Sequence, residues 1–136
     1  MGRAFKQHTV IMPTQLVSHV IFQIVRERFK QWDVYRLMRM GGEEIISWDE
    51  LRSGVSNLLQ TLKEMESRNE VRLSEFFHKF NPQRIAEEGI DYLRMFHTPA
   101  PVDFHSDGIA LNRLELLYFY SNRVRCYNIP NETWMR

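Results

Sequence analysis

Five histidines and one cysteine are the first residues of this 136-residue chain to consider for chemistry. A helical metal site needs two ligands three or four residues apart, because that spacing places both on one face. The histidines lack this spacing; they are His8, His19, His78, His97 and His105. Cys126 has no second cysteine to pair with, and we interpret it as structural. We therefore expect no metal ion and no cofactor.

One loop imitates half of a calcium site. Asp103, His105, Asp107 and Gly108 imitate the first half of an EF-hand loop, but the twelfth position, where the loop requires a bidentate Glu, is Leu114. We instead expect a polar loop in which Asp107 caps the next helix.

Two pairs of neighbouring carboxylates could suggest acid–base catalysis. The pairs Glu43-Glu44 and Glu87-Glu88 are adjacent in sequence, and adjacent residues project about 100° apart on a helix. Neither pair converges on a substrate as a general acid and base must. We predict that the protein is not an enzyme and has no catalytic residue and no small-molecule substrate. The alternative is a small enzyme with an unfamiliar cleft, in which His78, Glu87 or Glu88 would converge.

A mixture of cationic and aromatic side chains is the strongest candidate for a binding surface. Arginine, tryptophan and tyrosine are the usual anchors of protein interfaces. The seven predicted partner-binding residues are Arg26, Arg28, Phe29, Trp32, Tyr35, Arg36 and Arg39. RNA could stack on the same rings, but the balanced charge of the chain disfavours it. The competing interpretation is a plain helix with basic flanks.

The amino-acid composition excludes several further classes of protein. The net charge of +1 argues against DNA binding, and one cysteine excludes disulfide and zinc-ribbon scaffolds. No stretch reaches the roughly 20 apolar residues of a membrane span, so contact with a membrane would be peripheral at most. The first 26 residues hold basic but no acidic side chains, which is typical of a mitochondrial targeting segment. The alternative is a basic surface on the first helix.

The hydrophobic pattern predicts helices for most of the chain. We predict an all-α domain spanning 1–136, a small bundle of three to five amphipathic helices. It divides into an N-terminal arm (1–13), a helical core (14–96), a proline-containing linker (97–108), and a C-terminal helix or hairpin with an extended tail (109–136).

The first helix begins near Thr14, with His19 and Gln23 on its polar side, and its pattern continues toward Met40. In the second, Ser47 and Glu50 form a capping box before a stripe of Leu51, Val55, Leu58, Leu62 and Met65.

Three more segments complete the prediction. A helical stretch covers 71–80, and Asn81-Pro82 starts another helix with Ile85, Gly89, Tyr92, Leu93 and Phe96 inside. Residues 110–128 suit either a helix or a β-hairpin, and we choose the helix because its first part is rich in Leu and Glu.

Two short stretches resemble a known family. Val34-Tyr35-Arg36, followed by Arg39, is similar to the Leu-Tyr-Arg motif of the LYR family, and Arg26-Glu27-Arg28-Phe29 resembles its Arg-x-Arg-Phe stretch. Val replaces Leu here, and the two stretches occur in the reverse order. The resemblance implies a small helical accessory subunit or assembly factor of a mitochondrial respiratory complex.

Together these features predict a non-catalytic accessory subunit of a larger assembly, stabilised by contacts with protein subunits. The preferred host is a respiratory-chain or other membrane complex of the mitochondrion, at the inner membrane or in the matrix. The alternatives are a soluble helical adaptor in the cytoplasm, a mitochondrial ribosomal protein, and the enzyme considered above.

Overall fold

The computed structural model of the chain describes residues 10–31, 33, 36, 45–95, 102–105, 107–111, 114–127, 129 and 134. Its elements are β1 (Val10–Ile11), α2 (Pro13–Arg28), β2 (Ile45–Ile46), α4 (Trp48–Ser67), β3 (Arg72–Leu73), α5 (Phe76–Lys79), α6 (Pro82–Met95), β4 (Val102–His105), β5 (Gly108–Leu111) and α7 (Leu114–Arg125). The fold is mainly helical, as predicted. The all-α prediction omitted two small sheets. Most of both predicted arms lies outside the described residues.

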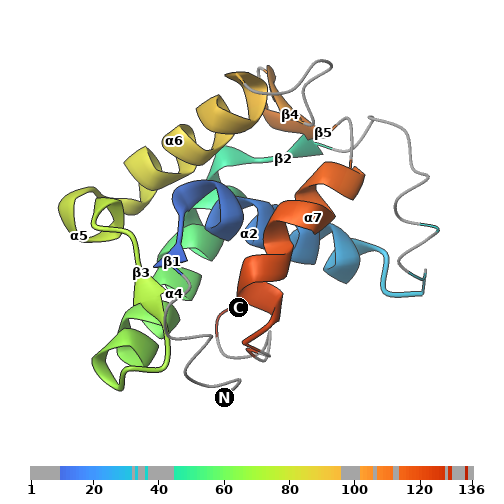
Figure 1. Cartoon of the computed structure of the whole chain (residues 1–136). Coiled ribbons are helices and arrows are strands. Elements are labelled where there is room, and N and C mark those ends of the chain that lie inside the picture. The colour runs from blue at the N-terminus through green and yellow to red at the C-terminus, as the bar shows by residue number, and fades with distance from the viewer. Residues whose placement is uncertain are drawn as a thin grey trace.

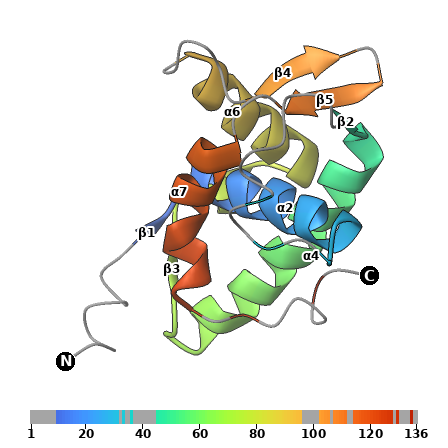
Figure 2. The same ribbon diagram turned by 90° about the vertical axis from the view of Figure 1, so that its right-hand side faces the viewer.

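Helix α2 runs through the middle of the molecule, with α4, α6 and α7 packed around it (Figures 1 and 2). It begins at Pro13, whose fixed φ suits the first turn, and the backbone N–H of Met12 donates to the Gln15 side chain at 2.8 Å. His19 and Gln23, predicted for its polar side, are both buried. That prediction is wrong because neighbouring elements cover the side that a surface helix leaves in water.

Two glycines allow the flanking helices to approach α2 closely. A Cβ atom at Gly54 of α4 would lie 2.6 Å from Cγ1 of Val20, and one at Gly89 of α6 would lie 2.6 Å from Cγ2 of Val17. Real side chains do not come that near, so any larger residue would push the helices apart. The sequence thus builds a tightly packed core around α2.

Helix α4 has both of its ends capped. The Ser47 hydroxyl accepts a hydrogen bond from the Glu50 N–H at 3.1 Å, and the Glu50 carboxylate accepts one from the Ser47 N–H at 3.3 Å, which confirms the capping box. At the other end Asn69 has a φ of 60°, and Glu70 donates to the Met65 carbonyl at 2.9 Å, as in a Schellman motif. The predicted apolar stripe is buried from Leu51 to Leu62, and Met65 is partly buried.

The segment after α4 is only partly helical. Strand β3 pairs in parallel with β1, with Ile11 opposite Leu73, and only Phe76–Lys79 forms a helix, so a helix over the whole of 71–80 is wrong. The predicted start of α6 is confirmed, because the Asn81 side chain accepts from the Arg84 N–H at 2.9 Å. Tyr92 was assigned to the inner face but is 43% exposed. Phe96 lies outside the described residues.

The predicted linker contains a β-hairpin. Strands β4 and β5 pair antiparallel, with Phe104 opposite Ile109, and β5 also pairs with β2. Asp107 lies in the turn between β4 and β5, so its predicted role as a helix cap is wrong. Gly108 has a φ of 155°, and a Cβ there would lie 2.0 Å from the Ile46 carbonyl oxygen. Only glycine therefore allows β5 to lie this close to β2.

The last segment is helical, as chosen, and the hairpin alternative for 110–128 is wrong. Leu114, Leu117, Ser121 and Val124 of α7 are buried, so one face of this helix packs inward against α2.

Candidate functional sites

The predicted Arg-aromatic cluster does not lie on one helix. Helix α2 ends at Arg28, Phe29 has non-helical dihedral angles, and 30–31 form a turn, so continuation of one helix to Met40 is wrong. Of the predicted binding residues, Arg26 and Arg36 are exposed and Phe29 packs partly against the core. Trp32, Tyr35 and Arg39 lie outside the described residues.

Arg28 fastens α2 to neighbouring elements. Its guanidinium donates to the Ile45 carbonyl oxygen at 2.8 Å and to the Glu50 carboxylate at 2.6 Å. The Arg28–Glu50 pair therefore connects the end of α2 with the start of α4. Partial burial favours a higher pKa for Glu50, but the hydrogen bonds from Arg28 and from Ser47 outweigh it and lower this pKa.

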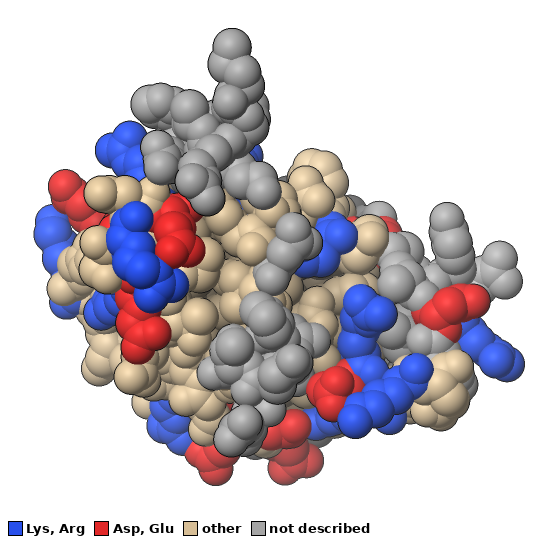
Figure 3. Space-filling view, turned by 90° about the horizontal axis from the view of Figure 1, so that it is seen from below, with Lys and Arg blue, Asp and Glu red and all other residues tan. Residues whose placement is uncertain are grey.

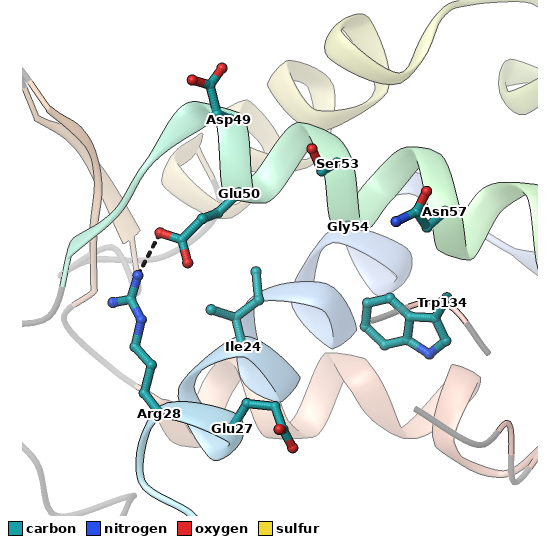
Figure 4. A pocket seen from close by; sticks show the side chains of 9 residues that line it. All are labelled: Ile24, Glu27, Arg28, Asp49, Glu50, Ser53, Gly54, Asn57 and Trp134. Carbon is teal, nitrogen blue, oxygen red and sulfur yellow. Dashed lines mark hydrogen bonds and ion pairs between the residues drawn. The ribbon is translucent and has the colours of Figure 1, made fainter. Parts of the chain in front are cut away.

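A cavity of about 520 Å³ opens beside this pair, between α2 and α4. Ile24, Gly54 and Trp134 form its apolar part, and charged side chains stand at its rim (Figure 4). We call it the α2–α4 cavity.

Each carboxylate at its rim has a cation beside it. Glu27 pairs with Lys30 at 3.0 Å, Asp49 pairs with Arg52, and Glu50 pairs with Arg28. In Figure 4, Glu27 and Asp49 point away from the cavity. Of these pairs, Arg28–Glu50 connects α2 with α4, whereas the other two join residues three apart in the chain, and the three carboxylates do not form a converging acid and base.

Two buried rings lie at the cavity: Trp134 lines it, and His19 lies next to Trp134. The centroids of His19 and Trp134 are 5.7 Å apart, and no residue in the described ranges forms a hydrogen bond with the ring nitrogens of His19 or with Nε1 of Trp134. Burial, aided by the nearby charge of Arg125, lowers the pKa of His19 to about 4. His19 is therefore neutral at pH 7 and belongs to the core.

The other potential metal ligands do not assemble. His78 lies 2.9 Å from the Glu66 carboxylate, while His8 and His97 lie outside the described residues. In the part of the chain that is described, no three His, Cys, Asp or Glu side chains are placed to hold a metal ion. Glu87 and Glu88 lie on α6, and Arg84 pairs with Glu88 at 3.8 Å.

A second hollow lies where the start of α2 meets α6 and α7. It has a volume of about 350 Å³ and is lined by Met12 and by the rings of Phe76, Tyr92 and Tyr120. Among its described lining residues, Glu88 carries the only charge. We call this hollow the aromatic groove.

Five large apolar side chains of the described residues are exposed, and each either lines this groove or is adjacent to a residue that lines it. They are Met12, Phe80, Tyr92, Met95 and Phe119, and we call this surface the α6–α7 face. Met12 and Tyr92 line the groove itself. Phe80 stacks on Phe76 with ring centroids 4.4 Å apart, and Phe119 meets the edge of Tyr120 at 5.6 Å. Met95 lies one turn beyond Tyr92 on α6.

Sequence reasoning missed this face. The α6 pattern placed Tyr92 inside, and the run Leu116 to Tyr120 is apolar throughout, so it does not reveal that Phe119 points to solvent. The spacing of Leu114, Leu117, Ser121 and Val124 could have revealed it. These four residues share one face of a helix, and Phe119 then lies on the opposite face.

Comparison with known proteins gives no match, either to a family model or to a curated protein or a solved structure. Among the described helices, none is both long enough and apolar enough to span a bilayer.

Proposed function

We propose that this protein is a non-catalytic accessory subunit that binds a protein partner through the α6–α7 face. The observation that carries the proposal is that two exposed apolar side chains, Met12 and Tyr92, line one groove, while exposed Phe80 and Phe119 contact two further rings that line it. Large apolar side chains scattered singly over a surface need no explanation, whereas a contiguous group marks an interaction site. Tyrosine, phenylalanine and methionine are also enriched at the centres of protein interfaces.

The charged surface elsewhere contrasts with this face. Seen from below in Figure 3, the described Lys and Arg side chains lie beside Asp and Glu rather than in a patch of one sign. Surface ion pairs of this kind contribute little to stability and leave little net field to attract a phosphate backbone. This mixture supports a protein partner over a nucleic acid.

For the host we propose a mitochondrial membrane complex. The acid-free, basic composition of residues 1–26 and the similarity of Val34-Tyr35-Arg36 to the Leu-Tyr-Arg motif support this compartment. Contacts with a membrane would be peripheral.

The test is purification of the tagged full-length chain from its native cells in mild detergent, followed by a native gel and mass spectrometry. We expect migration at high mass with a constant set of mitochondrial membrane-complex subunits. Migration of the protein alone near 16.4 kDa would contradict the proposal.

A matched pair of variants assigns the contact to the face. Tyr92→Ala with Phe119→Ala removes two exposed rings, and Arg68→Ala with Glu70→Ala removes an exposed ion pair beyond the end of α4. We expect the first pair to lose the partners and the second to retain them. Equal capture by both would show that binding uses another surface.

A further inference from the structure

We propose that the aromatic groove binds the ammonium group of a lysine side chain presented by the partner protein. This inference rests on the proposed function, because it names the chemistry by which the α6–α7 face would recognise its partner.

Aromatic rings from separate elements line the groove. Phe76, Tyr92 and Tyr120 come from α5, α6 and α7, so three separate elements bring aromatic groups to one hollow. The faces of aromatic rings carry negative charge density and attract cations within about 6 Å of the ring centroid. Partial burial, followed by the proximity of Tyr92, raises the pKa of Tyr120. Tyr120 therefore stays neutral near pH 7, with its phenol close to that of Tyr92.

The charge of the groove is negative and complements a cation. Glu88 precedes Tyr92 by four residues, which places both on one flank of α6, and no Lys or Arg stands among the described lining residues. Arg84 pairs with Glu88 across 3.8 Å, but their side chains are 53% and 43% exposed. An exposed pair at this distance is weak and exchanges readily for another cation. A ligand cation in the groove would therefore meet one carboxylate and three rings.

The polar residues of the groove favour lysine among the organic cations. The residues that line the groove include four with a hydroxyl or carboxylate group: Ser74, Tyr92, Tyr120 and Glu88. The three N–H donors of a primary ammonium can rotate toward scattered acceptors, whereas a quaternary ammonium has no donor. A guanidinium also stacks on aromatic rings, but its rigid fork of five donors matches a planar acceptor better than separate hydroxyl groups. Met12 and Pro13 give the groove an apolar wall that suits the methylene stem of lysine.

The test uses n-butylammonium, which reproduces the end of a lysine side chain, and 1-pentanol as its neutral analogue. Each is titrated into the purified full-length chain, and the NMR signals of the Met12 methyl group and of the tyrosine rings are followed. We expect saturable shifts with butylammonium at millimolar concentration and at least tenfold weaker binding of pentanol. Equal binding of the two probes, or tighter binding of tetramethylammonium or ethylguanidinium, would overturn the assignment to lysine.

Variants locate the site. Glu88→Gln keeps the shape of the side chain and removes its charge, so we expect about tenfold weaker butylammonium binding. Glu64→Gln makes the same change on an exposed position of α4 and should bind like the wild type. Unchanged binding by Glu88→Gln would overturn the proposal, and a wild-type amide spectrum of this variant would exclude misfolding as the cause of a loss.

Partner capture separates this inference from the proposed function. If Tyr92→Ala with Phe119→Ala loses the partners while Glu88→Gln retains them fully, the face binds protein but the lysine assignment fails. If butylammonium binds in the groove while the ring variants keep every partner, the face does not dock a partner, and both proposals fail despite the ammonium site. Loss of capture in both variants, together with selective butylammonium binding, supports both.

Discussion

The two hollows of the molecule differ in how their polar and apolar groups are satisfied. In the α2–α4 cavity each rim carboxylate already has a cation, and Arg28 holds both Glu50 and the Ile45 carbonyl. In the aromatic groove Met12 and Tyr92 are exposed, Phe76 and Tyr120 are partly buried, and the single described charge is loosely paired. A hollow whose charged groups already pair with one another stabilises the fold. Exposed aromatic rings, in contrast, contribute favourable free energy to binding when a partner buries them.

We therefore expect substitutions in the two regions to have opposite effects on stability and on partner binding. Changes around the α2–α4 cavity should lower stability and leave partner binding intact, and changes in the α6–α7 face should do the reverse.

The largest effect should come from His19, next to Trp134 at the α2–α4 cavity. The unfolded chain takes up a proton on this residue near pH 6.5, but burial and the charge of Arg125 lower the pKa in the fold to about 4. The free energy of unfolding should therefore fall as the pH drops from about 6.5 to about 4, by about 3 kcal/mol from this group. Urea unfolding of the wild type and of His19→Leu at pH 7 and pH 4 measures it. An equal fall in both proteins would mean that His19 is not held neutral.

The next effect should appear in binding. Tyr92→Ala should weaken partner binding by about 2 kcal/mol, or about 30-fold, because it removes a ring from the centre of the face. Binding of the purified variant to the isolated partner complex measures this loss. Thermal unfolding is the control, and a large drop in melting temperature would show that Tyr92 supports the fold instead.

A smaller effect should follow from breaking the link between α2 and α4. Glu50→Ala removes half of the capping box and the partner of Arg28, so the free energy of unfolding should fall by about 1–2 kcal/mol. Urea unfolding measures the loss. Loss of partner binding at unchanged stability would contradict the structural role of this cavity.

The smallest effect should be that of Met95→Gln on stability. The Met95 side chain is 72% exposed, so the free energy of unfolding should change by less than about 0.5 kcal/mol. A larger loss would place Met95 in the core rather than on the face.

Local signals in the sequence predicted the ends of several helices. The capping box of Ser47 and Glu50 and the Asn81 cap depend on residues three apart, so a short pattern is enough to find them. The turn at Asp107-Gly108 was also a usable hairpin signal, but the prolines before it favoured the interpretation as a linker.

Long-range packing could not be predicted in the same way. The burial of His19 depends on α7 and Trp134, which lie about a hundred residues later in the chain, and the pattern of α2 alone does not contain them. The aromatic groove is likewise assembled from α5, α6 and α7, whose relative positions no single periodicity encodes.

The central position of α2 also affects how the chain reaches its folded state. Ribosomes deliver α2 early, but α7, which packs against it, emerges roughly ninety residues later. Until then the side of α2 that α7 covers has no native partner, and such exposed apolar surface binds chaperones or aggregates. A nascent chain arrested before Leu114 should therefore be sensitive to proteases, even though most of its helices have already been synthesised.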